Sequence, residues 1–269
     1  QIVLFDEALR LDILRRFRTL EGLGRGFELA QLELWYQPIF DIHDGSIVAA
    51  EALLRWPGGV WMEGAAHIMS AAERTNLMDR LNGWVVESAC RQAARWAGHG
   101  LVTHINMSPR QLVQPNLTQR VLAAIERAQL QPNDIAIEVT ESSAMSDPAI
   151  DGIREMSDAG LRICLDDFGT GYANLAALRA LPIDMVKLDR TVVAGIHDGS
   201  PAVAMVEAVV GMATALCMRV TAEGIETQEE LETIDACGCD LAQGYLLSRP
   251  MAAEALEGKL SLPHARRLA

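Results

Sequence analysis

The fold is decided by the stretch LDDFGTGYAN, residues 165–174. The residues just before it, LRICL at 161–165, are mostly apolar, which is typical of a parallel strand covered on both faces. Two aspartates follow at once, and a glycine-rich turn comes after them. The stretch therefore predicts a buried strand whose carboxyl end carries two adjacent acidic groups.

Asp166 and Asp167 repel each other at this strand end. One of them is expected to stay protonated unless a cation keeps both charged. A divalent metal is the simplest such cation, and carboxylate oxygens suit Mg²⁺ or Mn²⁺, with Asp166 able to bridge two ions. The alternative is that the pair only caps the helix that follows.

From residue 34 onward, short apolar runs alternate with helical stretches, and this alternation predicts a parallel sheet. Only residues 41–46 separate the first two strands, too few for a crossover helix, so this pair is expected to be antiparallel. The pattern favours an α/β fold, a (β/α)₈ TIM-like barrel with an irregular antiparallel first strand. The expected strands are 34–40, 47–53, 101–105, 134–139, 161–165, 183–188, 218–222 and 240–243. The expected helices are 66–77, 81–97, 109–128, 148–159, 175–180, 201–216 and 228–236.

The N-terminal part differs from this core. Residues 1–26 read as a linker helix, because apolar side chains recur at helical spacing before Gly22, Gly24 and Gly26 break the pattern. A dimerisation segment is the alternative. Residues 27–269 are assigned to one domain. The first residue is Gln1, so we expect the chain to be part of a longer protein with additional sensory or signalling domains.

Composition excludes several classes of function. The formal net charge of −13 argues against a broad basic surface for duplex nucleic acid. The longest apolar candidate for a membrane span, 202–218, contains Glu207, so no span is expected. The five cysteines are scattered through apolar contexts, which indicates reduced thiols in a cytoplasmic protein. We do not expect the close pair Cys237 and Cys239 to bind metal.

Polar residues recur where the expected strands end. Barrel active sites are built at these carboxyl ends, so the side chains should converge in one mouth. Taken singly, each has a structural explanation as an interior ion pair or a turn former. Together they provide enough carboxylates for a two-metal hydrolytic centre. The residues are Glu51, Asn106, Glu138, Glu141, Asp166, Asp167, Lys187, Glu223 and Gln243.

The order and spacing of the motifs resemble the EAL domain, the family of cyclic di-GMP phosphodiesterases. The resemblance covers about 32–255. The matching pieces are YQPI at 36–39, EALLRW at 51–56, INMS at 105–108, EVTES at 138–142, DDFGTGY at 166–172, LPID at 181–184, KLD at 187–189, AEGIET at 222–227, QGY at 243–245 and SRP at 248–250.

The resemblance implies roles for individual residues. The first metal would be bound by Glu51, Asn106, Glu138 and Asp166, and the second by Asp166, Asp167 and Glu223. Lys187 and Glu223 would belong to the catalytic group together with Glu141, which would anchor the loop after the double aspartate. Lys187 would contact the attacking water, and between two cations its pKa is expected to be lowered. Gln37 and Arg55 would lie on the substrate side, while Gln243 would support the second-metal water network.

The implied activity is hydrolysis of cyclic di-GMP to linear pGpG with two Mg²⁺ or Mn²⁺ ions, and Ca²⁺ is expected to inhibit. A homodimer is implied through the loop 168–174. The alternatives are a silent cyclic di-GMP sensor or a dimerisation module, but every implied metal ligand is present. Residues 57–59, PGG, and 68–73, IMSAAE, depart from the family pattern, which leaves the shape of the substrate-side loops open.

Overall fold

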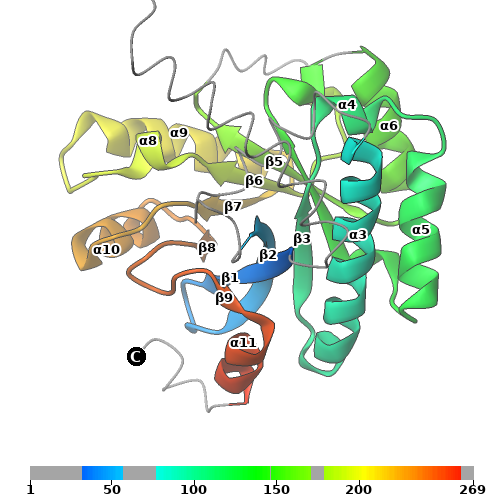
Figure 1. Cartoon of the computed structure of the whole chain (residues 1–269). Helices are drawn as coiled ribbons and strands as arrows, with labels where there is room; N and C mark the ends of the chain where they lie inside the picture. The colour runs from blue at the N-terminus through cyan, green and yellow to red at the C-terminus, as the bar shows by residue number, and fades with distance from the viewer. Residues whose placement is uncertain (1–31, 57–76, 146, 171–178, 262–269) are drawn as a thin grey trace, which may run out of the picture.

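A closed barrel of eight strands forms the centre of the molecule (Figure 1). The computed structural model describes residues 32–56, 77–145, 147–170 and 179–261. The strand order is β2-β3-β4-β5-β6-β7-β8-β1, and pairing of β1 with β2 closes the ring. The strands are β1 (Glu33–Asp41), β2 (Ile47–Arg55), β3 (Val102–Asn106), β4 (Ile135–Thr140), β5 (Arg162–Phe168), β6 (Met185–Leu188), β7 (Arg219–Ala222) and β8 (Leu241–Ala242), with a short β9 (Met251–Ala252) beside β1. All eight predicted strands are present, and β9 was not predicted.

The first strand has the predicted irregular orientation. β1 runs antiparallel to both β2 and β8, whereas the remaining neighbours from β2 to β8 are parallel. Side chains shape the turn between β1 and β2: Asp41 accepts a hydrogen bond from the backbone of His43, and Asp44 accepts one from Ser46. Such local bonds favour a tight turn over a helix.

The described helices surround the barrel, with α3 to α6 on one side of Figure 1 and α8 to α10 on the other. They are α3 (Leu77–Trp96), α4 (Pro109–Leu112), α5 (Leu117–Arg127), α6 (Asp147–Asp158), α8 (Arg190–Val193), α9 (Pro201–Ala215), α10 (Gln228–Ala236) and α11 (Ala253–Leu260). Three 3₁₀ turns are η1 (Ala97–His99), η2 (Pro132–Asp134) and η3 (Ser143–Met145).

Most helix predictions are confirmed, and one is wrong in detail. The single helix expected over 109–128 is two helices, because Pro115 lacks a backbone donor and Asn116 has a φ of 59°. The structure also contains α8 and α11, which were not predicted. The expected linker helix at 1–26 lies outside the described residues, as does nearly all of the helix at 66–77 and most of that at 175–180.

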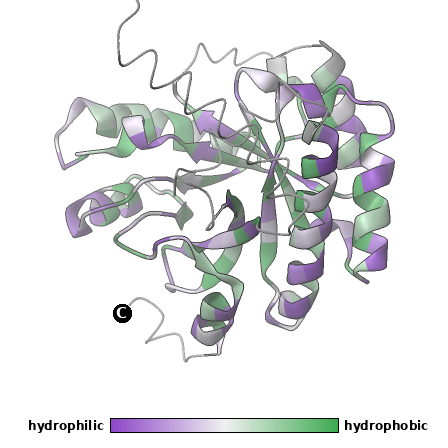
Figure 2. Cartoon of the chain, viewed as in Figure 1, coloured by the Kyte–Doolittle hydropathy of each residue, from purple (hydrophilic) through white to green (hydrophobic). Residues whose placement is uncertain are grey.

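The barrel separates two apolar regions. The larger core lies between the outer faces of the strands and the helices, where Figure 2 shows hydrophobic residues on the strands and hydrophilic ones on the outer helix faces. A smaller cluster includes Ile39, Ala49, Cys164, Met185 and Leu241, one residue from each of five strands. Because side chains alternate along a strand, the positions two residues later in β2, β5, β6 and β8 face the same way. These positions carry the polar residues of the candidate site.

Helix α6 depends on a close approach at Gly152. A Cβ added there would lie 2.5 Å from the carbonyl oxygen of Leu112, whereas a Cβ at Gly258 in α11 would have no atom within 4 Å. Alanine is the better helix former at both positions. We therefore expect Gly152→Ala to destabilise the protein by about 1–3 kcal/mol through overpacking. Gly258→Ala should be neutral or stabilising by roughly 0.5–1 kcal/mol. Chemical denaturation measures both, and equal effects of the two substitutions would contradict this account of the packing.

Candidate active site

The ammonium group of Lys187 lies at the centre of a ring of acidic side chains. Its Nζ is 2.5 Å from Glu223 Oε1, 2.9 Å from Glu138 Oε1, 3.3 Å from Asp166 Oδ1 and 3.4 Å from Glu51 Oε2. Lys187 is only 1% exposed. One buried cation therefore contacts four carboxylates from four different strand ends.

Strand register brings these groups to one level. Asn106 is the partner of Glu138 across β3 and β4, and Glu51 is the partner of His104 across β2 and β3. Glu223 directly follows β7, and Gln243 directly follows β8. The residues predicted at the strand ends therefore meet at the carboxyl end of the barrel, where a pocket of about 210 Å³ is lined by Glu51, Glu223 and Gln243.

Glu51 is held by neutral donors as well as by Lys187. Asn106 Nδ2 donates to Glu51 Oε1 at 2.7 Å, and Gln243 Nε2 donates to Glu51 Oε2 at 2.9 Å. Burial opposes ionisation, but Lys187 and the two amides hold the pKa of Glu51 below its ordinary value. Glu51 is therefore ionised.

Glu138 and Glu223 in the ring resist ionisation. Burial, and then the charge of Glu51, raises the pKa of Glu138 well above its ordinary value. Burial, with the charges of Asp166, Glu51 and Glu138, raises the pKa of Glu223 to about 8 despite the nearby Lys187. The ring thus carries more negative charge than Lys187 alone can balance.

The lowered Lys187 pKa expected between two bound cations stays a prediction, and the groups that the chain itself supplies act in the opposite direction. Burial favours the neutral amine, but the four carboxylates outweigh burial and raise the pKa of Lys187 well above its ordinary value. Lys187 is therefore a proton-bearing donor.

Asp167 occupies a distorted strand end. The pairing of β5 with β6 shifts register between Leu165 and Phe168, and Asp167 has a φ of 55°. Consecutive strand residues normally point to opposite faces, and a bulge breaks that alternation. Burial and the adjacent Asp166 raise the pKa of Asp167. The predicted repulsion between the two aspartates is therefore present.

The donor set fits divalent cations. Glu138 Oε2 and Gln243 Oε1 are buried acceptors without a hydrogen-bond partner in the described part of the chain. Buried acceptors left unpaired are costly unless a bound ion or water satisfies them. Carboxylate and amide oxygens around an excess of negative charge are the ligands that Mg²⁺ and Mn²⁺ prefer.

The remaining predicted residues lie around this ring. Gln37 lines the same pocket and donates to the carbonyl oxygen of Ser248. Arg55 donates to the carbonyl oxygen of Leu54. Burial lowers the pKa of Arg55, although the charges of Tyr245 and Glu51 oppose this shift. Glu141 accepts from the backbone nitrogen of Gly169 at 3.4 Å, so it contacts the turn after the double aspartate.

The sequence prediction missed residues on both sides of the ring. Arg190 and Tyr245 line the pocket at the mouth. Below the ring, His104 Nδ1 lies 2.8 Å from Glu138 Oε1. Burial, and then Lys187, lowers the pKa of His104 to about 3, so its imidazole is neutral. His104 lies two residues before Asn106, and this same-face spacing is the signal that could have identified it.

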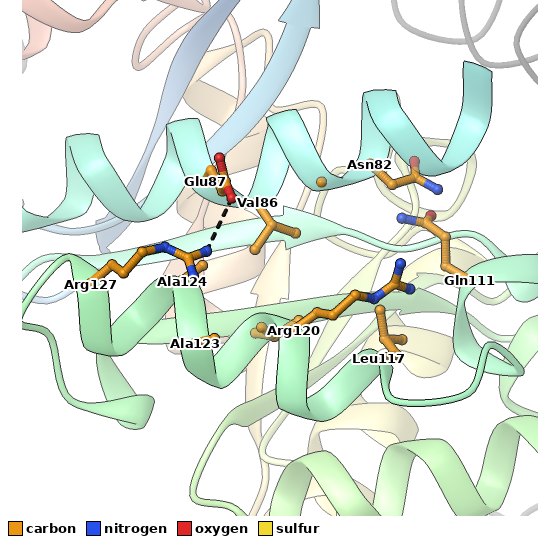
Figure 3. Close-up of a pocket in the computed structure, with 11 residues that line it drawn as sticks. Asn82, Val86, Glu87, Gln111, Leu117, Arg120, Ala123, Ala124 and Arg127 are labelled. Carbon is orange, nitrogen blue, oxygen red and sulfur yellow. Dashed lines mark hydrogen bonds and ion pairs between the residues drawn. The ribbon is translucent and has the colours of Figure 1, made fainter.

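A second pocket lies outside the barrel between α3 and α5 (Figure 3). Its lining includes Val86 and Val121, and Glu87, the one carboxylate among the described residues that line it, is paired with Arg127 at 3.0 Å. It lacks the converging acidic groups of the barrel mouth, which is therefore the candidate active site.

A buried acidic ring at the carboxyl end of a barrel lies where TIM-like barrels carry their active sites. Comparison with known proteins identifies the family. The EAL domain family matches residues 21–250, so the chain belongs to the EAL domain family of cyclic di-GMP phosphodiesterases.

Individual relatives agree with this placement. The bifunctional diguanylate cyclase/cyclic di-GMP phosphodiesterase MucR of Pseudomonas aeruginosa is 34% identical over 94% of this chain and 38% of its own length. A solved structure of the MucR phosphodiesterase in complex with c-di-GMP is 35% identical, with a TM-score of 0.83, covering 89% of this chain and 99% of that one. BlrP1 of Klebsiella pneumoniae, solved with calcium and cyclic di-GMP, is 28% identical, with a TM-score of 0.75, covering 82% and 56%.

The chain spans about a third of the length of the curated relatives that it matches. None of the described helices combines the length and the apolar character that crossing a bilayer requires.

The raised pKa of Glu223 predicts how stability depends on pH without divalent metal. Its folded-state pKa of about 8 exceeds its ordinary value of 4.5, so the folded protein holds the proton more tightly. The stability gained from this proton is lost as pH rises from the ordinary pKa towards the folded-state pKa. The raised pKa of Glu138 also makes the folded protein less stable as pH rises. In EDTA, the contribution of Glu223 to the melting temperature should therefore fall between pH ~4.5 and pH ~8.

Glu223→Gln should reduce this fall, because glutamine does not titrate. Glu226→Gln is the matched control, since Glu226 is exposed and pairs with Arg190 outside the ring. A parental pH slope in Glu223→Gln would contradict this account.

Proposed function

We propose that this chain is a metal-dependent phosphodiesterase that hydrolyses cyclic di-GMP to linear pGpG. The observation that carries the proposal is the ring of four carboxylates around Lys187 at the barrel mouth. Membership of the EAL family and the MucR phosphodiesterase complex with c-di-GMP support the choice of substrate.

The same residues would hold two divalent cations. Glu51, Asn106, Glu138 and Asp166 would bind the first, and Asp166, Asp167 and Glu223 would bind the second. When bound, such ions make a water molecule more acidic and neutralise charge on a phosphoryl oxygen. Deprotonation of Glu223 and Glu138 would accompany their binding, because carboxylates ligate in the ionised form.

Lys187 would orient the attacking water as a hydrogen-bond donor. Without bound metal, the surrounding carboxylates raise its pKa, which favours donation from the ammonium group over proton acceptance. Its position is fixed by contacts with Glu51, Glu138, Asp166 and Glu223, so the direction of donation would be fixed as well. Such positioning contributes to catalysis by placing the nucleophile in line with the scissile bond.

Other residues would act on the substrate or on the ligands. Gln37 and Arg55 would lie on the substrate side of the mouth, and Gln243 would support the second-metal water network while it holds Glu51. Glu141 would fix the turn after Asp167 through Gly169, so its role would be positional.

The wider partners are proposals as well. The curated relatives are about three times longer than this chain, which supports additional regulatory domains in the full protein. A homodimer through the loop 168–174 remains a proposal, because most of that loop lies outside the described residues. Sedimentation equilibrium tests it, and a monomer at every concentration would reject it.

The direct test is release of pGpG from cyclic di-GMP by the purified chain. We expect turnover with Mg²⁺ or Mn²⁺ and none in EDTA. In Ca²⁺, binding should persist without hydrolysis, because Ca²⁺ is larger and a poorer Lewis acid. Tight binding of cyclic di-GMP without cleavage in any of these metals would reject the enzyme and favour a sensor.

Three substitutions assign the roles. Glu51→Gln and Lys187→Met should each lower the single-turnover rate by at least about 100-fold, the loss expected for a misplaced reacting group. Glu141→Ala should lower turnover and weaken the apparent Mn²⁺ affinity by roughly 10–100-fold, as loss of support for a ligand does. Glu87→Gln, on α3 away from the mouth, should keep the parental rate. Rates within about threefold of the parent for the first two would remove those residues from the mechanism.

A further inference from the structure

The barrel has a second opening, at the end opposite the candidate active site. A cavity of about 430 Å³ is lined by residues at or near the starts of seven strands, from β2 to β8. Small side chains such as Ala49 and Ala136 lie where barrel interiors are usually filled by bulky ones. The cavity reaches inward to His104 and Cys164.

Three potential metal ligands converge at the inner end of this cavity. One ligand atom each from His104, Glu138 and Cys164 lies within 4.8 Å of the other two. Register explains the grouping: Cys164 is the partner of Glu138 across β4 and β5, and His104 lies on the adjacent β3. All three side chains are buried, with exposures of 1%.

The donor set differs in chemistry from the acidic ring above it. An imidazole nitrogen, a thiolate sulfur and a carboxylate oxygen suit Zn²⁺ and softer ions, whereas Mg²⁺ and Mn²⁺ prefer oxygen. Small adjustments would bring the three atoms to tetrahedral spacing, and water from the cavity could supply the fourth ligand. We propose that His104, Glu138 and Cys164 form a second metal site, for Zn²⁺ or a related soft cation, entered from the amino-terminal end of the barrel.

Binding there would compete with the candidate active site for Glu138. Glu138 Oε1 contacts both Lys187 Nζ, at 2.9 Å, and His104 Nδ1, at 2.8 Å. A cation held by His104 and Cys164 would draw this carboxylate downward and place positive charge near Lys187. The Cys164 thiol would release its proton to solvent as the metal–sulfur bond forms. The site would therefore inhibit turnover, a consequence that rests on the proposed function, whereas the site itself does not.

The test of the site uses Cd²⁺, whose bond to a thiolate gives an ultraviolet charge-transfer band that oxygen ligands do not produce. The parent protein should show a saturable band with one thiolate per chain. Cys164→Ala and Cys164→Ser should both lose it while keeping a parental circular dichroism spectrum. Cys217→Ser is the matched control, because Cys217 lines the same cavity but is exposed. Cys237→Ser controls for the close pair with Cys239, and both controls should keep the band. No band in the parent, or an unchanged band in both Cys164 variants, would overturn the proposal.

The regulatory consequence is tested by Zn²⁺ inhibition of pGpG release at fixed Mg²⁺. In Cys164→Ala, turnover without Zn²⁺ should equal that of the parent, and the inhibiting Zn²⁺ concentration should rise by at least about 10-fold. Equal inhibition of parent and variant would mean that Zn²⁺ acts at the acidic ring, and would overturn the regulatory role. If the parent shows no turnover with Mg²⁺, the proposed function fails, while the Cd²⁺ band still decides the metal site.

Discussion

The architecture of the site depends on how four buried carboxylates are neutralised. Lys187 contacts Glu51, Glu138, Asp166 and Glu223, and it supplies one positive charge. Burying an unpaired charge is expensive, so the remaining negative charge must be removed by protons or by cations. The raised pKa values of Glu138 and Glu223 show that protons neutralise part of this excess negative charge at these two residues. Divalent cations would neutralise the excess negative charge in place of these protons. The repulsion between carboxylates that is unfavourable in the metal-free protein would then favour metal binding.

The barrel makes this arrangement possible because its parallel strands all end at one rim. Each strand contributes at least one polar side chain, and the adjacent helices and outer core hold the strands in register. Two departures from regular geometry complete the rim. The antiparallel β1 brings Gln37 opposite Glu51, and the bulge in β5 releases Asp167 from the usual alternation. The fold therefore positions the acids, while local irregularities adjust them.

Much of this arrangement could be predicted from the sequence. Alternating apolar runs predicted eight strands and the antiparallel first pair, and the polar residues at the strand ends predicted Glu51, Glu138, Asp166, Lys187 and Glu223 as neighbours. These predictions succeed because strand periodicity and the carboxyl-end rule are local. The roles of these five residues as metal ligands or catalysts stay predictions.

Other features depend on contacts between elements and were not predicted. In the sequence, His104 lies within an apolar strand and was not singled out. Its contact with Glu138 depends on the register between β3 and β4. The amino-terminal cavity is lined by residues from seven strands, and no single segment signals it. The break between α4 and α5 was signalled by Pro115 and Asn116, but the apolar pattern continued across it. The direction of the Lys187 pKa shift in the metal-free protein likewise could be inferred only from its distances to four carboxylates.

The central claim is that the acidic ring around Lys187 binds divalent cations. Anomalous diffraction from crystals grown with Mn²⁺ tests it most directly, because it locates the ions without reference to activity. The account predicts two manganese peaks at the carboxyl-end mouth, each in contact with Asp166, with Glu51 and Glu138 beside one and Glu223 beside the other. Manganese bound elsewhere, with the acidic ring unliganded at saturating metal, would contradict the account.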